Sequence, residues 1–187
     1  KKNGDGDFRV LMFTDTHIKG DKQLDNMTVS YMVENIREQK PDLVILGGDN
    51  IHGYAGDGIT QFTAELKVKI AIDRYMSIFE ERNIPTAIVF GNHDGEEMVS
   101  KETQIKMYEK YDCFVGIDEG EDLYGCGNYN IPIMSSDSKS MAYNLWFFDS
   151  NSHCPIPDCD CGEYDWVHDD QVDWYLKKSN ELKKANG

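Results

Sequence analysis

Residues 86–94 read Thr-Ala-Ile-Val-Phe-Gly-Asn-His-Asp, and this stretch decides the fold. Its first five residues form an apolar run between a proline and a glycine, which is typical of a short buried strand in a parallel sheet. Asn92, His93 and Asp94 follow at the carboxyl end of that strand. Open α/β sheets bind their ligands at this end, so the stretch predicts both a strand and a site.

Two earlier segments follow the same plan. The apolar run 8–13 leads to Asp15 and His17, and the apolar run 43–46 leads to two glycines and Asp49. Side chains two residues apart on an extended loop can turn to the same side, so Asp15 and His17 could chelate one cation. The glycines allow a tight turn that places Asp49. Three strands therefore each end in residues that can hold a metal.

Helical periodicity between and after these strands predicts an α/β fold. The predicted helices span 24–39, 60–82, 96–111 and 169–183, and the predicted later strands span 112–116, 129–133 and 141–150. The apolar positions expected to face inward include Met27, Tyr31 and Ile36, then Phe62, Leu66, Ile70, Tyr75, Ile78 and Phe79, and finally Val172 and Leu176. The length suits one domain, 1–187, with the polar segment 1–7 as a disordered lead-in.

The three blocks, in this order, resemble those of the calcineurin-like metallophosphoesterases, which carry Asp-x-His, then Gly-Asp, then Gly-Asn-His-Asp or Glu. The segment 162–176 also resembles a subgroup related to purple acid phosphatases. The resemblance implies an α/β/β/α sandwich. A nucleotide-binding Rossmann-like module fits less well, because no Gly-x-Gly-x-x-Gly follows the first strand.

The resemblance also implies a chemistry and its residues. Asp15, His17, Asp49 and Asn92 would bind two divalent ions (Mn, Fe or Zn), with Asp49 bridging them. A metal-activated hydroxide would attack a phosphorylated substrate, and His93 would assist the leaving oxygen. The implied activity is that of a phosphatase, with phosphomonoesters favoured over diesters.

Two further residues near the expected site have open roles. His52 lies three residues after Asp49 and could contact the substrate phosphate, add a metal ligand or simply be an exposed loop residue. Asp94 could hold the imidazole of His93 in one tautomer, or could cap the helix expected to follow.

Two later family blocks, a lone histidine and a Gly-His-x-His, are not found in the chain. We therefore expect a sandwich that lacks its C-terminal part, completed by a C-terminal segment or by a second chain. The chain alone could be inactive. The alternative function is that of a non-catalytic fragment or scaffold that binds a cation weakly or not at all.

The formal net charge of −15 disfavours non-specific binding to nucleic acid or to anionic membranes. No apolar run approaches the length of a transmembrane helix, so we expect a soluble protein, cytoplasmic or secreted. Five cysteines are present, three of them clustered at 154–161. Their spacing favours a disulfide or free thiols over a structural zinc site.

Overall fold

The computed structural model of the chain describes residues 6–20, 22–52, 59–96, 98–119, 122–156 and 164–186. Three strands form a parallel sheet in the order β1-β2-β3: β1 is Val10–Phe13, β2 is Leu43–Gly47 and β3 is Thr86–Val89. Val10 pairs with Leu43, and Val44 pairs with Thr86. This register brings the carboxyl ends of all three strands to the same edge of the sheet.

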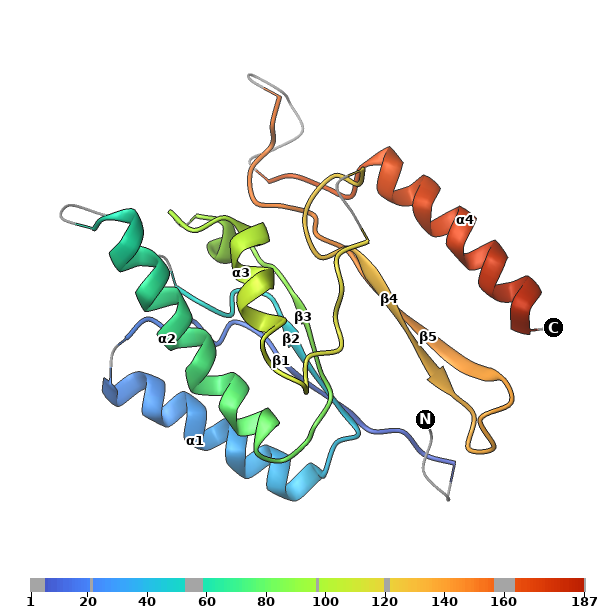
Figure 1. Cartoon of the computed structure of the whole chain (residues 1–187), viewed down its shortest axis with the longest axis horizontal. Coiled ribbons are helices and arrows are strands. Elements are labelled where there is room, and N and C mark those ends of the chain that lie inside the picture. Colours follow the sequence, from blue (N-terminus) through green and yellow to red (C-terminus); the bar gives the residue numbers. More distant parts are fainter. Residues whose placement is uncertain are drawn as a thin grey trace.

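Helices cover one face of this sheet (Figure 1). They are α1, Lys22–Gln39; α2, Gln61–Glu80; and α3, Lys101–Tyr108. Thr60 begins α2 by accepting a hydrogen bond from the backbone N–H of Thr63. Alternate residues of the strands, such as Val44 and Ile88, join the buried core beneath these helices.

The opposite face of the sheet carries a second β layer. Strands β4, Tyr129–Met134, and β5, Met141–Phe147, form an antiparallel pair. Tyr129 and Phe147 stack with ring centroids 4.5 Å apart, and they are buried against Leu43 and Ala87 of the first sheet. The Tyr129 hydroxyl also accepts a hydrogen bond from the Ile88 N–H and donates one to the Ile88 carbonyl oxygen.

Helix α4, Asp169–Asn186, lies beyond this hairpin on the side away from the first sheet (Figure 1). The layers are therefore helices, sheet, sheet and helix, so the predicted α/β class and its four-layer arrangement are confirmed. The second layer has two strands in the described residues. On the face of β1 that points toward this layer, Val10 and Met12 remain 42% and 58% exposed.

A buried polar network joins α3 to the second layer and α4. Lys101 Nζ donates to both carboxylate oxygens of Asp149, at 2.8 and 2.9 Å, and Asp149 is 1% exposed. Gln171 of α4 donates to the carbonyl oxygen of Asp149 and to Asn128 Oδ1. These contacts give Asp149 a structural role, because they hold α3 and α4 to the second layer.

The predicted inward faces of the helices were wrong in part. Phe62, Leu66 and Ile70 of α2 are exposed, as are Met27 and Tyr31 of α1 and Val172 and Leu176 of α4. Tyr75, Ile78 and Phe79 of α2 are buried as predicted, and the rest of its buried stripe consists of Ala64, Val68, Ala71, Ile72 and Met76. The small residues in its first half allow close packing, so the larger neighbouring side chains are rotated outward.

Two predicted elements differ from the structure. The helix expected at 96–111 is shorter, because Ser100 accepts a hydrogen bond from the Thr103 N–H and begins α3 at Lys101. The strand expected at 112–116 is reduced to a single bridge between Phe114 and Thr86. Most of the lead-in, the glycines of 53–58, Cys159 and Cys161 lie outside the described residues. Among the described helices, none combines the length and apolar character that crossing a bilayer requires.

Candidate metal centre

The loops after β1 and β2 are joined by backbone hydrogen bonds that continue the parallel pairing. The Asp15 N–H donates to the Gly48 carbonyl at 3.0 Å, and the His17 N–H donates to the Asp49 carbonyl at 3.0 Å. Ile18 then forms a further parallel bridge with Ile51. This pairing brings the Asp-x-His block against the Gly-Asp block, as the strand order predicts.

Three of the candidate ligands have left-handed backbone conformations. The φ angle is 54° at Asp15, 45° at His17 and 51° at Asp49. Residues other than glycine rarely adopt this region, because it strains their backbone. Strained residues of this kind are found most often at functional sites, where contacts with the surrounding structure stabilise them. Here the hydrogen bonds between the two loops hold the strained residues in place.

The third block approaches the second through two glycines. A Cβ atom on Gly91 would lie 2.2 Å from Asp49 Oδ1 and 2.4 Å from the Asp49 backbone nitrogen. Gly48 also favours glycine, because its φ angle of +104° strains any side chain and a Cβ atom would lie only 3.1 Å from Gly91 Cα. The sequence predicted a tight turn at Gly48, but it did not predict that position 91 must lack a side chain to make room for Asp49.

Asp49 lies at the centre of the resulting cluster. Its Oδ1 accepts a hydrogen bond from the His93 backbone N–H at 2.9 Å, and its Oδ2 is 3.9 Å from His17 Nε2. Asp15 Oδ1 lies 4.0 Å from the same His17 nitrogen. His17, Asp49 and His93 each offer a ligand atom within 4.8 Å of the others.

These residues fit a divalent cation. The buried Nδ1 atom of His17 has no hydrogen-bond partner among the described residues. The hydrogen-bonding capacity of this imidazole is therefore not satisfied by the protein residues around it. Carboxylate oxygen and imidazole nitrogen together suit zinc, iron and manganese. Asn92 lies half-buried directly before His93 and could add an amide oxygen.

Neither role expected for Asp94 matches the structure. Its carboxylate is fully buried and accepts hydrogen bonds from the backbone N–H groups of Gly91, Asn50 and Ile51, at 2.8, 3.2 and 2.9 Å. It therefore does not cap α3, which Ser100 caps, and it does not hold the imidazole of His93, which is hydrogen-bonded to Glu96. Burial raises the pKa of Asp94 to about 6, although these N–H groups favour the ionised form. Asp94 fastens the loop after β3 to the loop after β2.

The imidazole of His93 is held by Glu96, a partner that sequence analysis missed. His93 Nδ1 lies 2.6 Å from Glu96 Oε2, and this hydrogen bond is the main cause that raises the pKa of His93. The short 3-10 helix η1, His93–Gly95, brings the two together. A carboxylate three residues after a histidine is the signal that could have indicated this pair.

His52 stands at the rim of the same cluster. Its side chain is exposed, and its ring centroid lies 5.8 Å from the centroids of both His17 and His93. The His52 N–H donates to the Ile18 carbonyl at 3.1 Å, which anchors the backbone at this point.

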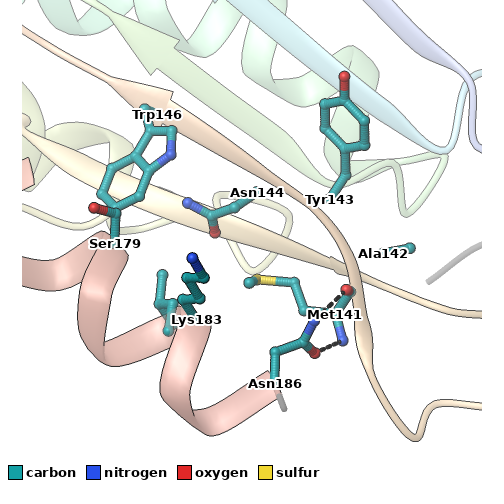
Figure 2. A pocket seen from close by; sticks show the side chains of 9 residues that line it. Met141, Ala142, Tyr143, Asn144, Trp146, Ser179, Lys183 and Asn186 are labelled. Atoms are coloured by element: carbon teal, nitrogen blue, oxygen red, sulfur yellow. Dashed lines mark hydrogen bonds between the residues drawn. The ribbon is translucent and has the colours of Figure 1, made fainter.

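A separate groove of about 440 Å³ lies between β5 and the last turns of α4. Figure 2 shows Asn186 hydrogen-bonded to the backbone of Met141, with Trp146 over Ser179 and Tyr143 pointing away from the helix. The residues that line the groove come from β5 and α4. The groove therefore shares no residue with the three loops that carry the candidate ligands.

Comparisons with known proteins agree with this arrangement. The sequence profile described as "Calcineurin-like phosphoesterase" matches residues 8–183. "Probable inactive purple acid phosphatase 14" of Arabidopsis thaliana is 27% identical, over 97% of this chain and 49% of that protein. "Probable inactive purple acid phosphatase 29" of the same plant is 28% identical, over 96% of this chain and 49% of that protein.

A yeast protein, "Phosphatase DCR2" of Saccharomyces cerevisiae, is 26% identical, over 91% of this chain and 31% of that protein. The chain spans about half the length, or less, of these three relatives. The family profile covers the three strand–loop blocks and both β layers. The chain therefore belongs to the calcineurin-like phosphoesterase family.

Proposed function

We propose that this chain forms part of a metal-dependent phosphoester hydrolase that uses two divalent ions and acts on a phosphorylated substrate, with monoesters favoured. The observation that carries the proposal is the position of Asp49. One of its oxygens is held by the His93 N–H, while the other faces His17. A carboxylate held between two other candidate groups suits the role of bridging ligand.

In this proposal, Asp15, His17, Asp49 and Asn92 bind the ions. Bound divalent ions would activate water for attack on phosphorus and neutralise charge on the phosphate oxygens. The strained loops keep the donor atoms in position before any cation arrives, so little reorganisation is needed. A C-terminal segment or a second chain would complete the ligand set.

His93 is the proposed general acid. A group that gives a proton to a leaving oxygen must be protonated when substrate binds. The hydrogen bond to Glu96 raises the pKa of His93, which favours the protonated form of the ring. The same contact occupies Nδ1, so the Nε2–H is left to donate to the leaving group.

The test is hydrolysis of a chromogenic aryl phosphate monoester, and of the matching diester, by the chain loaded with Mn²⁺, Fe²⁺ or Zn²⁺. Asp49→Asn should lower turnover by more than about a hundredfold, since loss of groups that merely support metal ligands costs 10–100-fold. Asp112→Asn is the matched control, because Asp112 is exposed near the amino end of β3. Full activity in Asp49→Asn would refute the mechanism.

A second candidate is a non-catalytic cation-binding unit. It is favoured by two of the relatives above, whose names describe them as probable inactive purple acid phosphatases. Stoichiometric metal binding without hydrolysis of either ester, after a C-terminal segment or a second chain has completed the ligand set, would support this second function. Hydrolysis that depends on Asp49 would exclude it.

A further inference from the structure

A pocket of about 320 Å³ lies where the beginning of α1 meets the middle of α2. These two helices run side by side in the outer helical layer (Figure 1). The described residues that line the pocket come from the loop after His17, from the first turn of α1 and from α2, and they include none of the candidate metal ligands. Pockets of this size hold small organic molecules, so the pocket is a candidate binding site separate from the metal centre.

The pocket concentrates positive charge in an acidic chain. Its described lining contains the cationic side chains of Lys19, Lys22, Lys67 and Arg74 and one carboxylate, that of Asp25. The whole chain has a formal net charge of −15, so most of its surface repels anions. Cations that gather in a cleft reverse the sign of the local potential. The pocket therefore favours an anionic ligand that the rest of the surface does not attract.

The carboxylate of Asp25 is already compensated by contacts within the fold. It is buried and accepts hydrogen bonds from the backbone N–H groups of Lys19 and Gly20, at 3.3 and 2.9 Å. Arg74 of α2 also donates to this carboxylate, at 3.3 Å, and so ties the two helices together. Within the part of the chain that the structure describes, the side chains of Lys19 and Lys22 form no ion pair. The lysines therefore set the charge that a ligand would meet.

The rest of the pocket wall is apolar. Ile18 and Ala71 are buried, whereas Ile70, which also lines the pocket, is 53% exposed. The methylene groups of the lysine side chains add to such a wall while their ammonium groups stay in water. Covering Ile70 removes apolar surface from water, which is favourable. A ligand that fits the pocket should therefore carry an apolar group beside its anionic group.

We propose that this pocket binds a small organic anion. Its phosphate, phosphonate or carboxylate group would be held by Lys19, Lys22 and Lys67, and its apolar group would pack against Ile70 and Ala71. A lysine ammonium suits such a group, because it is a compact charge with three hydrogen-bond donors. The site requires no metal ion, so it goes beyond the hydrolase function proposed above and does not depend on it.

The test uses the whole 187-residue chain with a chelator present, so that no cation brings an anion to the metal centre. Phenylphosphonate, benzoate, inorganic phosphate and benzylamine are each titrated by calorimetry. We expect one phenylphosphonate or benzoate per chain, bound at least about tenfold more tightly than inorganic phosphate, since burying two carbon groups of the ring contributes about that factor. Binding should weaken with added salt, and the cationic benzylamine should not bind. The ratio of the phenylphosphonate and benzoate affinities identifies the preferred anionic group.

Variants locate the bound anion. Lys22→Gln and Lys67→Gln should each weaken binding by about two- to fivefold, the effect of losing one exposed ion pair. Ile70→Gln should weaken it by at least about threefold, because less apolar surface covers the ring. Lys69→Gln and Leu66→Gln are the matched controls, because both residues are exposed on α2 and lie outside the pocket lining. Circular dichroism checks that each variant is folded.

Three outcomes would overturn the proposal. The metal-free chain could bind neither phenylphosphonate nor benzoate, or Lys69→Gln could weaken binding as much as Lys67→Gln does. The third is an affinity that falls in His93→Ala, which would place the anion at the metal centre. None of these results bears on ester hydrolysis by the metal-loaded chain, so the failure of this proposal and the failure of the proposed function are distinguishable.

Discussion

Replacing Gly91 by alanine should disrupt the candidate site through sterics alone. The new Cβ atom would lie 2.2 Å from Asp49 Oδ1 and 2.4 Å from the Asp49 backbone nitrogen. Ordinary contact begins near 3.4 Å, so the two loops must separate by about 1 Å. Overpacking of this kind costs about 1–3 kcal/mol, and a 1 Å misplacement of a reacting group can cost about 10²-fold in rate.

Gly47→Ala is a closely matched control. Its Cβ atom would also meet another atom at 2.2 Å, but that atom is the terminal methyl carbon of Met12. Met12 is largely exposed and flexible, so it can move aside. We expect the free energy of unfolding of this variant to stay within about 1 kcal/mol of wild type, because any residual strain is offset by the lower entropy of the unfolded chain.

The measurements are urea unfolding, thermal unfolding and calorimetric titration with Zn²⁺. For a chain of this size, 1 kcal/mol corresponds to about 2–4 °C in Tm, so Gly91→Ala should lower Tm by about 2–12 °C. The Zn²⁺ affinity of Gly91→Ala should fall as well, whereas Gly47→Ala should keep the Tm and the Zn²⁺ affinity of the wild type. If the two alanine variants behaved alike, the steric argument for the approach of the two loops would be wrong.

Three further predictions concern other contacts. Lys101→Met should lower the free energy of unfolding by about 3–5 kcal/mol in urea titrations, because the buried Asp149 carboxylate loses its cation; a change below 1 kcal/mol would contradict this estimate. Asp94→Ala leaves three N–H groups without an acceptor, two of them buried and one half-buried, and should cost at least about 3 kcal/mol by the same assay. In the metal-free chain, Glu96→Gln should lower the pKa of His93, followed by NMR titration of its ring. The pKa of His93 is raised in the folded state, so the stability that Glu96 adds should be fully present below the unfolded-state pKa near 6.5. This stability should be lost as the pH rises through the folded-state pKa of His93.

The strand–loop blocks were predictable because parallel strands bring their carboxyl ends to one edge. That rule was sufficient to place Asp15, His17 and Asp49 together and to anticipate the first sheet. The later strands were also identifiable, since 129–133 and 141–150 overlap β4 and β5.

Other features depend on contacts between distant segments, which periodicity does not report. The outward rotation of Phe62 follows from how closely α2 packs on its neighbours, and the burial of Asp94 follows from backbone N–H groups of another loop. Glu96 lies in a segment predicted as helix, so its contact with His93 through η1 was not considered. The requirement for glycine at position 91 likewise depends on the position of Asp49.

The hydrogen bond from the His93 N–H to Asp49 Oδ1 joins residues 44 positions apart. Such a contact exists only after the crossover connection through α2 has closed, so the candidate ligands are scattered in the unfolded chain. A cation that recognises their arrangement therefore binds the native state alone, and at a hundred times its Kd it would add about 2.7 kcal/mol to the free energy of unfolding. Treatment with a chelator would remove this contribution, and amide hydrogen exchange should then rise first in the three loops that the cation had held together.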